Sequence, residues 1–167
     1  MKTEAGCSKA AADTGASPQF RQAEVGDIPA MSAIRLAVRE NVLSNPARVT
    51  PQMYRDYLAV LGRGWVAQLD GEIAGFSYAD QTDGSIWALF IAPEHEGKGL
   101  GRALLQLATD WLFAQGHERV RLSTGAGTRA ERFYAEQGWQ REREVNGDVH
   151  YCLMAQARQG DQAESLV

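Results

Sequence analysis

Residues 93–105 read PEHEGKGLGRALL, and this stretch decides how the chain is expected to fold. Three glycines occupy alternate positions from Gly97 to Gly101, directly before an apolar pattern of helical spacing. A backbone without side chains can direct consecutive N–H groups toward one point, and the next helix adds its unpaired N–H groups and the positive end of its dipole. The stretch therefore predicts a loop and helix start that bind phosphate, with Lys98 and Arg102 as local cations.

Two common nucleotide-binding patterns do not fit this spacing. The pattern GxxxxGK[ST] would need a glycine at Ala92 and a hydroxyl at Gly99. The dinucleotide pattern GxGxxG meets Arg102 or Leu104 at the position of its third glycine. A simple turn from strand to helix would explain one or two glycines, so three glycines interleaved with a cation favour phosphate binding.

The composition favours one globular domain. A chain of 167 residues with 44% hydrophobic residues can fill one core, and its net charge of −4 argues against a nucleic-acid binder. Residues 1–18 and 157–167 are polar and are predicted to be tails around a domain at 19–156, without a membrane span. Cys7 and Cys152 fit neither a metal spacing nor a disulfide framework, which favours the cytoplasm and predicts no metal site.

Segments on both sides of the opening stretch predict the element order βααβββαβαββ. Asp27 and Thr50 are expected to cap two early helices, and an apolar period of three to four residues predicts a helix from Gly99 to Gln115, closed by Gly116. The strand segments begin with residues 20–25, and hairpins are expected at Asp70-Gly71, Asp83-Gly84 and Asn146-Gly147. This order predicts an α/β (α+β) fold, with a mixed, mostly antiparallel central sheet flanked by helices.

At EGKGLG, residues 96–101, the chain resembles the GNAT superfamily of acetyl-CoA-dependent N-acyltransferases, whose hallmark is R/Q-x-x-G-x-G/A. The specific parts of the resemblance are WALFIAPEHEGKGLGRALL at 87–105 and RAERFYAEQGW at 129–139, and it extends over 19–156. It implies the acyl-CoA N-acyltransferase fold. Two positions depart from the pattern: Glu96 replaces Arg or Gln, and Gly127 stands where Asn is common.

The resemblance also implies how acetyl-CoA would bind. The pantetheine arm would pair with the backbone of the strand that leads into the loop, and the pyrophosphate would lie over the glycines, where Glu96 contributes only its N–H. Arg129 would reach a phosphate or the acceptor, although it could equally be a solvated arginine at a helix start. The implied cofactor-binding residues are Leu89, Phe90, Ile91, Glu96, Gly97, Lys98, Gly99, Leu100, Gly101, Arg102 and Arg129.

For catalysis, the family's general-acid tyrosine falls on Tyr134, which could otherwise be a core aromatic residue. A base must remove the amine proton, and Glu40 is the candidate, with Asp80 and a water relay as alternatives. The acyl oxygen would accept from the N–H of Ile91. His95, beside the phosphates, is expected to be too far from the amine. The predicted acceptor residues, from helix facing, are Arg39, Asn41, Ser44, Tyr54 and Trp87.

The resulting functional hypothesis is an N-acetyltransferase that uses acetyl-CoA and a primary amine of a small molecule or peptide, with no metal, nucleic-acid or membrane partner. Direct attack in a ternary complex is expected because no histidine pairs obviously with Cys152. Two alternatives are open: a CoA-binding sensor module without turnover, and a structural domain of the same fold. An exposed sheet edge can also pair two copies, and the sequence leaves open whether a homodimer forms.

Overall fold

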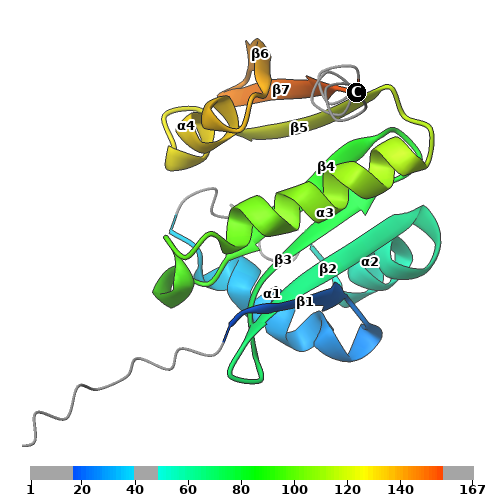
Figure 1. Cartoon of the computed structure of the whole chain (residues 1–167), viewed down its shortest axis with the longest axis vertical. Helices are drawn as coiled ribbons and strands as arrows, with labels where there is room; N and C mark the ends of the chain where they lie inside the picture. Colours follow the sequence, from blue (N-terminus) through cyan, green and yellow to red (C-terminus); the bar gives the residue numbers. More distant parts are fainter. Residues whose placement is uncertain (1–16, 40–48, 156–167) are drawn as a thin grey trace, which may run out of the picture.

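The computed structural model describes residues 17–39 and 49–155, and its helices and strands follow the predicted order βααβββαβαββ. Figure 1 shows β5, β7, β6 and α4 at one end of the molecule, β1, β2, α1 and α2 at the opposite end, and α3 in the middle in front of β4. The elements are β1 (Gln19–Gln22), α1 (Ile28–Ala37), α2 (Pro51–Asp56), β2 (Gly62–Leu69), β3 (Glu72–Asp80), β4 (Ser85–Ile91), α3 (Leu100–Ala114), β5 (Arg119–Gly125), α4 (Arg129–Glu136), β6 (Gln140–Val145) and β7 (Asp148–Met154).

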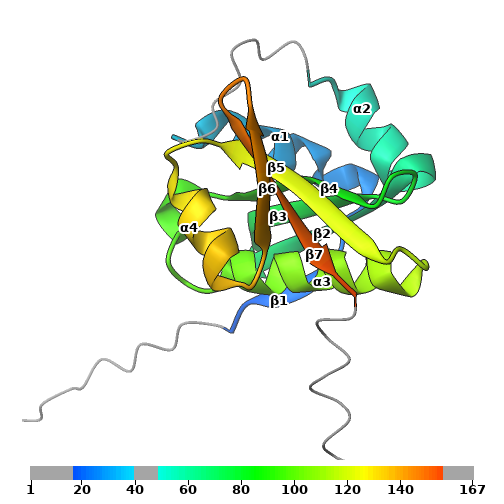
Figure 2. The same cartoon turned by 90° about the horizontal axis from the view of Figure 1, so that it is seen from above.

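The sheet has seven strands in the order β1-β2-β3-β4-β5-β7-β6 and consists of two antiparallel parts. The first four strands pair antiparallel in succession, and β5, β7 and β6 form the second part. Between these parts, β4 and β5 run parallel, and their described register contains the single pair Ser85 and Arg121. Figure 2 shows the two strands running at an angle to each other. The predicted mixed, mostly antiparallel sheet is confirmed.

Each face of the first part of the sheet carries its own core. Apolar residues at helical spacing place Leu104, Ala108 and Leu112 of α3 in one core, which also includes Tyr134 of α4. On the other face, α1 contributes Met31 to a second core together with aromatic side chains from α2 and β3. The helices therefore hold the sheet from both sides. Among the described residues, no helix is long and apolar enough to cross a membrane.

The N-terminal strand and cap differ from the prediction. The strand ends at Gln22, and a 3-10 turn over Val25–Asp27 replaces the expected strand end. Asp27 stands at the start of α1, but its carboxylate accepts hydrogen bonds from both terminal nitrogens of Arg21 at 2.7 Å and from the N–H of Glu24 at 2.8 Å. Asp27 is the N-cap residue of α1 as predicted, but its carboxylate makes no capping hydrogen bond to the helix, because a guanidinium is a stronger partner than a helix N–H.

The second predicted helix changes its winding before it ends. Thr50 caps α2 as predicted, since its hydroxyl accepts from the N–H of Met53 at 3.3 Å. The chain then forms a π-helical turn over Tyr57–Leu61 and enters β2 at Gly62. A Cβ atom at Gly62 would overlap the carbonyl oxygen of Ala79 on β3, so glycine is needed for this close approach.

Candidate active site

The candidate site is the gap where β4 and β5 separate. Beyond Ser85, their described register contains no further pair, so the edge of β4 that faces β5 presents backbone groups without a strand partner. The pairing of β4 with β3 also shifts at Trp87, because Tyr78 pairs with Ala88 and Ala79 with Ile86. One extra residue of this kind is a β-bulge, which increases the local twist and redirects side chains.

The glycine loop closes the open end of this gap. Gly97 and Gly99 have φ angles of 77° and 80°, a region that favours glycine, and Gly99 stands at the N-cap of α3. Gly101 differs, since a Cβ atom there would meet its nearest atoms, on Ile91 and Phe133, at an ordinary 3.8 Å. The backbone conformation therefore requires glycine at positions 97 and 99. Gly101 leaves the first turn of α3 without a side chain at that position, although the protein's own packing has space for one.

Two cavities lie in the gap. The larger, which we call the loop cavity, has a volume of about 470 Å³ and is bounded by β4, the glycine loop and the starts of α3 and α4. The smaller, the strand cavity, has a volume of about 300 Å³ and lies between the diverging β4 and β5. Four residues line both: Leu89, Phe90, Ala130 and Tyr134. The two cavities therefore meet along β4 and one face of α4.

Tyr134 is placed at this junction by the helical spacing of α4. Its residue is 6% exposed, and its ring packs against those of Phe133, Trp139 and Tyr151 at centroid distances of 5.2, 6.0 and 5.9 Å. Burial raises the pKa of the Tyr134 phenol well above its ordinary value of 10.0, so the hydroxyl stays protonated at neutral pH. A protonated phenol at the meeting point of two cavities can donate a proton to a leaving group.

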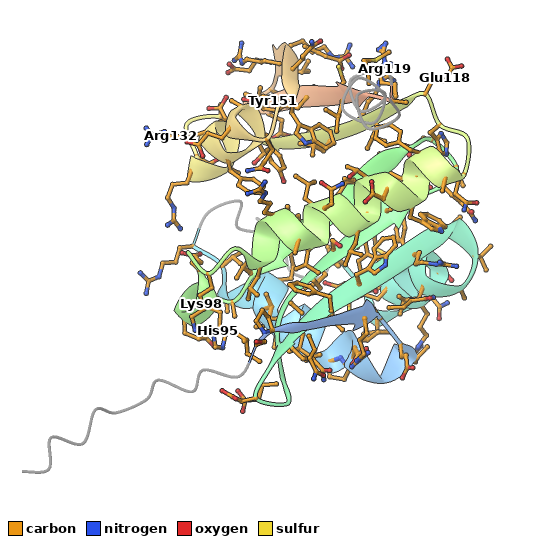
Figure 3. All side chains as sticks on the ribbon, in the orientation of Figure 1. His95, Lys98, Glu118, Arg119, Arg132 and Tyr151 are labelled. Atoms are coloured by element: carbon orange, nitrogen blue, oxygen red, sulfur yellow. The ribbon has the colours of Figure 1, made fainter. Side chains whose placement is uncertain are left out.

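The charged side chains of the loop, Glu96 and Lys98, each contact another polar side chain of the protein. Glu96 Oε2 accepts a hydrogen bond from Arg129 Nη2 at 2.8 Å, which links the loop to the start of α4 across the loop cavity. In this structure the Glu96 carboxylate thus has a partner within the protein, and the prediction that Glu96 offers the cofactor only its backbone N–H stays a prediction. Lys98 lies with its Nζ 3.0 Å from Nδ1 of His95, and Figure 3 shows this pair at the outer end of the loop. Lys98 does not belong to the described lining of either cavity, whereas Arg102 lines the loop cavity.

The predicted acceptor residues are only partly brought together. Trp87 lines the strand cavity and also an inner cavity of about 140 Å³, which Tyr54 lines from α2. Arg39 is exposed and belongs to the described lining of none of the three cavities. The predictions for Glu40, Asn41 and Ser44 lie outside the described residues.

The alternative base, Asp80, lies at the closed end of the gap. It pairs with Ser85 at the end of the strand where β4 and β5 are still joined. Its carboxylate accepts a hydrogen bond from the N–H of Thr82 at 2.8 Å, so it stabilises the turn between β3 and β4.

Sequence reasoning missed two charged residues that line the strand cavity, Arg35 of α1 and Asp148 of β7. Arg35 follows the buried Ile34 and lies four residues after the buried Met31, so its helix position already indicated a side chain beside the core. Asp148 directly follows the Asn146-Gly147 turn, and nothing in its local pattern separates it from an ordinary turn residue. Within 17–39 and 49–155, no group of three or more potential metal ligands occurs.

Solved structures share this architecture at low sequence identity. The chain matches the ribosomal-protein-S18-alanine N-acetyltransferase from Escherichia coli with a TM-score of 0.68 and 18% identity, covering 83% of this chain and 94% of that one. It matches the PaiA N-acetyltransferase from Thermoplasma acidophilum, solved in complex with coenzyme A, with a TM-score of 0.70 and 16% identity over 83% and 99% of the two chains. These likenesses show the fold.

Sequence comparison finds relatives over part of the chain. An uncharacterised N-acetyltransferase from Archaeoglobus fulgidus is 34% identical over 86 residues, which are 46% of this chain and 58% of the relative. A mycothiol acetyltransferase from Beutenbergia cavernae is 36% identical over 81 residues, which are 45% of this chain and 27% of that protein. The chain thus spans less than two thirds of the length of either relative.

The family model of the acetyltransferase (GNAT) family matches residues 32–139, which is more than half of the chain. This range contains the bulged β4, the glycine loop, α3 and Tyr134, the features that build the two cavities. Because the match extends over more than half of the chain and includes these features, we conclude that the chain belongs to the acetyltransferase (GNAT) family.

Proposed function

We propose that the protein is an N-acetyltransferase that transfers the acetyl group of acetyl-CoA to a primary amine of a small molecule or peptide. The observation that carries this proposal is the position of Tyr134, which lines both the cavity at the glycine loop and the cavity between the diverging strands. A cofactor thioester at their junction would have the acceptor on one side and its own phosphates on the other. The buried phenol of Tyr134 would then lie beside the carbon–sulfur bond that breaks, where it could protonate the leaving sulfur.

The residues of the loop cavity fit the parts of acetyl-CoA. The bare first turn of α3, from Leu100 to Arg102, offers N–H groups and the positive end of a helix dipole to the pyrophosphate. The unpaired edge of β4 can hydrogen-bond the two amides of a pantetheine arm as an added strand would. Arg129 lies beside the same cavity, where the phosphates would compete with Glu96 for its guanidinium.

The proposed reaction is direct attack. The neutral amine nitrogen forms a bond to the thioester carbon, the carbon–sulfur bond breaks, and the Tyr134 hydroxyl gives its proton to the leaving sulfur. The nitrogen loses a proton as it becomes the amide, and that proton returns through water to the Tyr134 oxygen, which restores the phenol. An alkyl amine with a pKa of about 10.4 is mostly protonated at neutral pH, so a base must first take one proton, and Glu40 remains our candidate. Cys152, the cysteine in the described part of the chain, is buried on β7 with a pKa raised by burial, which disfavours a covalent acyl intermediate on its sulfur.

Calorimetric titration with acetyl-CoA and CoA, combined with thiol release over a broad amine panel, tests the proposal. We expect saturable binding of acetyl-CoA and amine-dependent release of one thiol for each amide formed. Tight binding without turnover on any amine would support the alternative of a CoA-binding sensor module. No binding up to millimolar concentrations would contradict both the enzyme and the sensor.

A further inference from the structure

Arg35 is the cationic side chain that the described acceptor-side cavities have in common. It lines the strand cavity and the inner cavity of about 140 Å³, together with Trp87, Ala88 and Phe90. In the inner cavity the remaining lining is Val49 and Tyr54, so its described walls are aromatic and aliphatic apart from the guanidinium. A ligand that enters either cavity would therefore meet the same positive charge.

The positive charge of Arg35 lies over an aromatic ring. The guanidinium carbon of Arg35 lies 4.2 Å from the centroid of the Phe90 ring, which is a cation–π distance. Burial lowers the pKa of Arg35 from its ordinary value, against the opposing effect of Tyr54, but an arginine stays charged at neutral pH. A guanidinium carries five N–H donors in its plane, so beside its contact with Phe90 it can donate to a ligand carboxylate through two parallel hydrogen bonds.

A carboxylate faces the strand cavity from the other part of the sheet. Asp148 lies at the start of β7, where it pairs with Gly125 at the end of β5, and it lines the same cavity as Arg35. Its negative charge favours a ligand that carries an ammonium group. With a cation from α1 and an anion from β7, the cavity complements a molecule that carries both kinds of charge.

We propose that the acceptor is a small amino-acid-like molecule whose anionic carboxylate binds Arg35, while its amine faces the junction at Tyr134. This inference rests on the proposed acetyltransferase function and names its substrate class. The strand cavity, at about 300 Å³, is at the small end of ligand pockets, which favours a free amino acid over a long peptide. The aromatic walls at Trp87 and Phe90 favour an apolar side chain on that amino acid.

Matched acceptors test the proposal on the unaltered protein. L-Phenylalanine, L-phenylalaninamide and phenethylamine share a side chain and differ in the group that would meet Arg35. We expect kcat/KM, expressed per neutral amine, to be about 10- to 100-fold higher for the amino acid than for the other two. The same comparison with leucine and its derivatives covers aliphatic side chains. Equal values for acid and amide across both sets would overturn the proposal.

Substitutions of Arg35 then test whether this residue binds the carboxylate of the acceptor. In Arg35→Gln, kcat/KM for the acid should fall to about the value for the amide, because the KM for the acid rises. Arg35→Lys should retain part of the preference for the acid. Arg63→Gln is the matched control, because the guanidinium carbon of Arg63 also lies over an aromatic ring, 5.2 Å from the centroid of Trp111. Trp111 lies in the last turns of α3, at the end that is far from the glycine loop. Equal losses for acid and amide in Arg35→Gln would mean that Arg35 only supports the fold.

The acetyl-CoA titration separates this proposal from the function on which it rests. If acetyl-CoA binds and neutral amines are acetylated as well as amino acids, the acceptor assignment fails and the acetyltransferase stands. If peptides with a free N-terminus are preferred over every free amino acid, the acceptor is larger than proposed and the assignment to free amino acids fails. If acetyl-CoA does not bind, the proposed function itself fails.

Discussion

Tyr134 shows how one residue can serve both the core and the chemistry. Its ring packs against three other aromatic rings, and its residue lines two cavities. The alternatives of core aromatic and general acid are therefore compatible. The burial that makes the ring part of the core also keeps the phenol protonated, because a phenolate is poorly solvated in an apolar environment.

Replacing Tyr134 by phenylalanine should lower the rate of acyl transfer and leave cofactor binding nearly unchanged. The phenyl ring retains the packing, but the thiolate then leaves without a proton donor, so we expect kcat to fall by about 100-fold or more. Thiol release measures kcat, and calorimetry measures the acetyl-CoA affinity. Tyr151→Phe is the control, because Tyr151 packs against Tyr134 but is not part of the described lining of either cavity.

The pH profile gives a second readout for Tyr134. The rate should rise with pH as the amine loses its proton. Because burial raises the pKa of Tyr134, the phenol should stay protonated between pH 7 and about pH 10. Loss of the phenol proton should therefore cause no fall of kcat in this range. A kcat for Tyr134→Phe that equals that of the unaltered protein across this range would show that the residue is structural.

At the scale of the element, the start of α3 contains one glycine that its own backbone conformation requires and one that the protein's packing does not require. Gly99 adopts a positive φ at the N-cap, whereas Gly101 lies inside the helix with ordinary space for a methyl group. Alanine is a better helix former than glycine by about 0.5–1 kcal/mol. The protein's own packing therefore gives no reason for a glycine at position 101, and the proposed contact with the cofactor phosphates would supply one.

Gly101→Ala should separate stability from binding. The free energy of unfolding should stay the same or rise by about 0.5–1 kcal/mol, while the dissociation constant for CoA rises at least about tenfold, because a methyl group blocks the approach of phosphate to the helix start. Denaturant unfolding and calorimetry measure the two effects. Gly26→Ala is the control, since nothing lies within 4 Å of a Cβ atom there. Unchanged CoA affinity in Gly101→Ala would contradict the assignment of the loop.

At the scale of the whole molecule, the site depends on how weakly the two parts of the sheet are joined. In the described residues, β4 and β5 share the single pair Ser85 and Arg121, and α3 packs across both parts. The ion pair between Glu96 and Arg129 adds a link across the loop cavity, between two exposed side chains. An exposed ion pair contributes little to stability, so a ligand that contacts β4 and α4 would add a stronger connection.

Acetyl-CoA should therefore raise the melting temperature of the whole chain as one unit. At a concentration of about 100 times its dissociation constant, binding contributes about 2.7 kcal/mol, which corresponds to a shift of about 5–10 °C for a chain of this size. Thermal denaturation followed by circular dichroism measures the shift, and the same nucleotide with Gly101→Ala should produce a smaller one at equal concentration. Binding by calorimetry without any shift would contradict this prediction.

The order of elements could be predicted from the sequence because it depends on local causes. Apolar periodicity produced α3, a hydroxyl and a proline produced the start of α2, and the glycine spacing identified the loop before any contact was known. Local patterns failed where another side chain competed for the predicted hydrogen bond, or where the winding of a helix changed. Examples are Asp27, which binds Arg21 in place of the helix, and the π-helical turn after α2.

The sequence by itself determined the family and the element order. Only the tertiary structure decided which distant charges share a cavity: Arg35 with Asp148, and Glu96 with Arg129. The physical reason is that periodicity assigns a side chain to a face of its own element and carries no information about distance between elements. That distance depends on the angle at which β4 and β5 separate, which the twist of the sheet and the packing of α3 determine together.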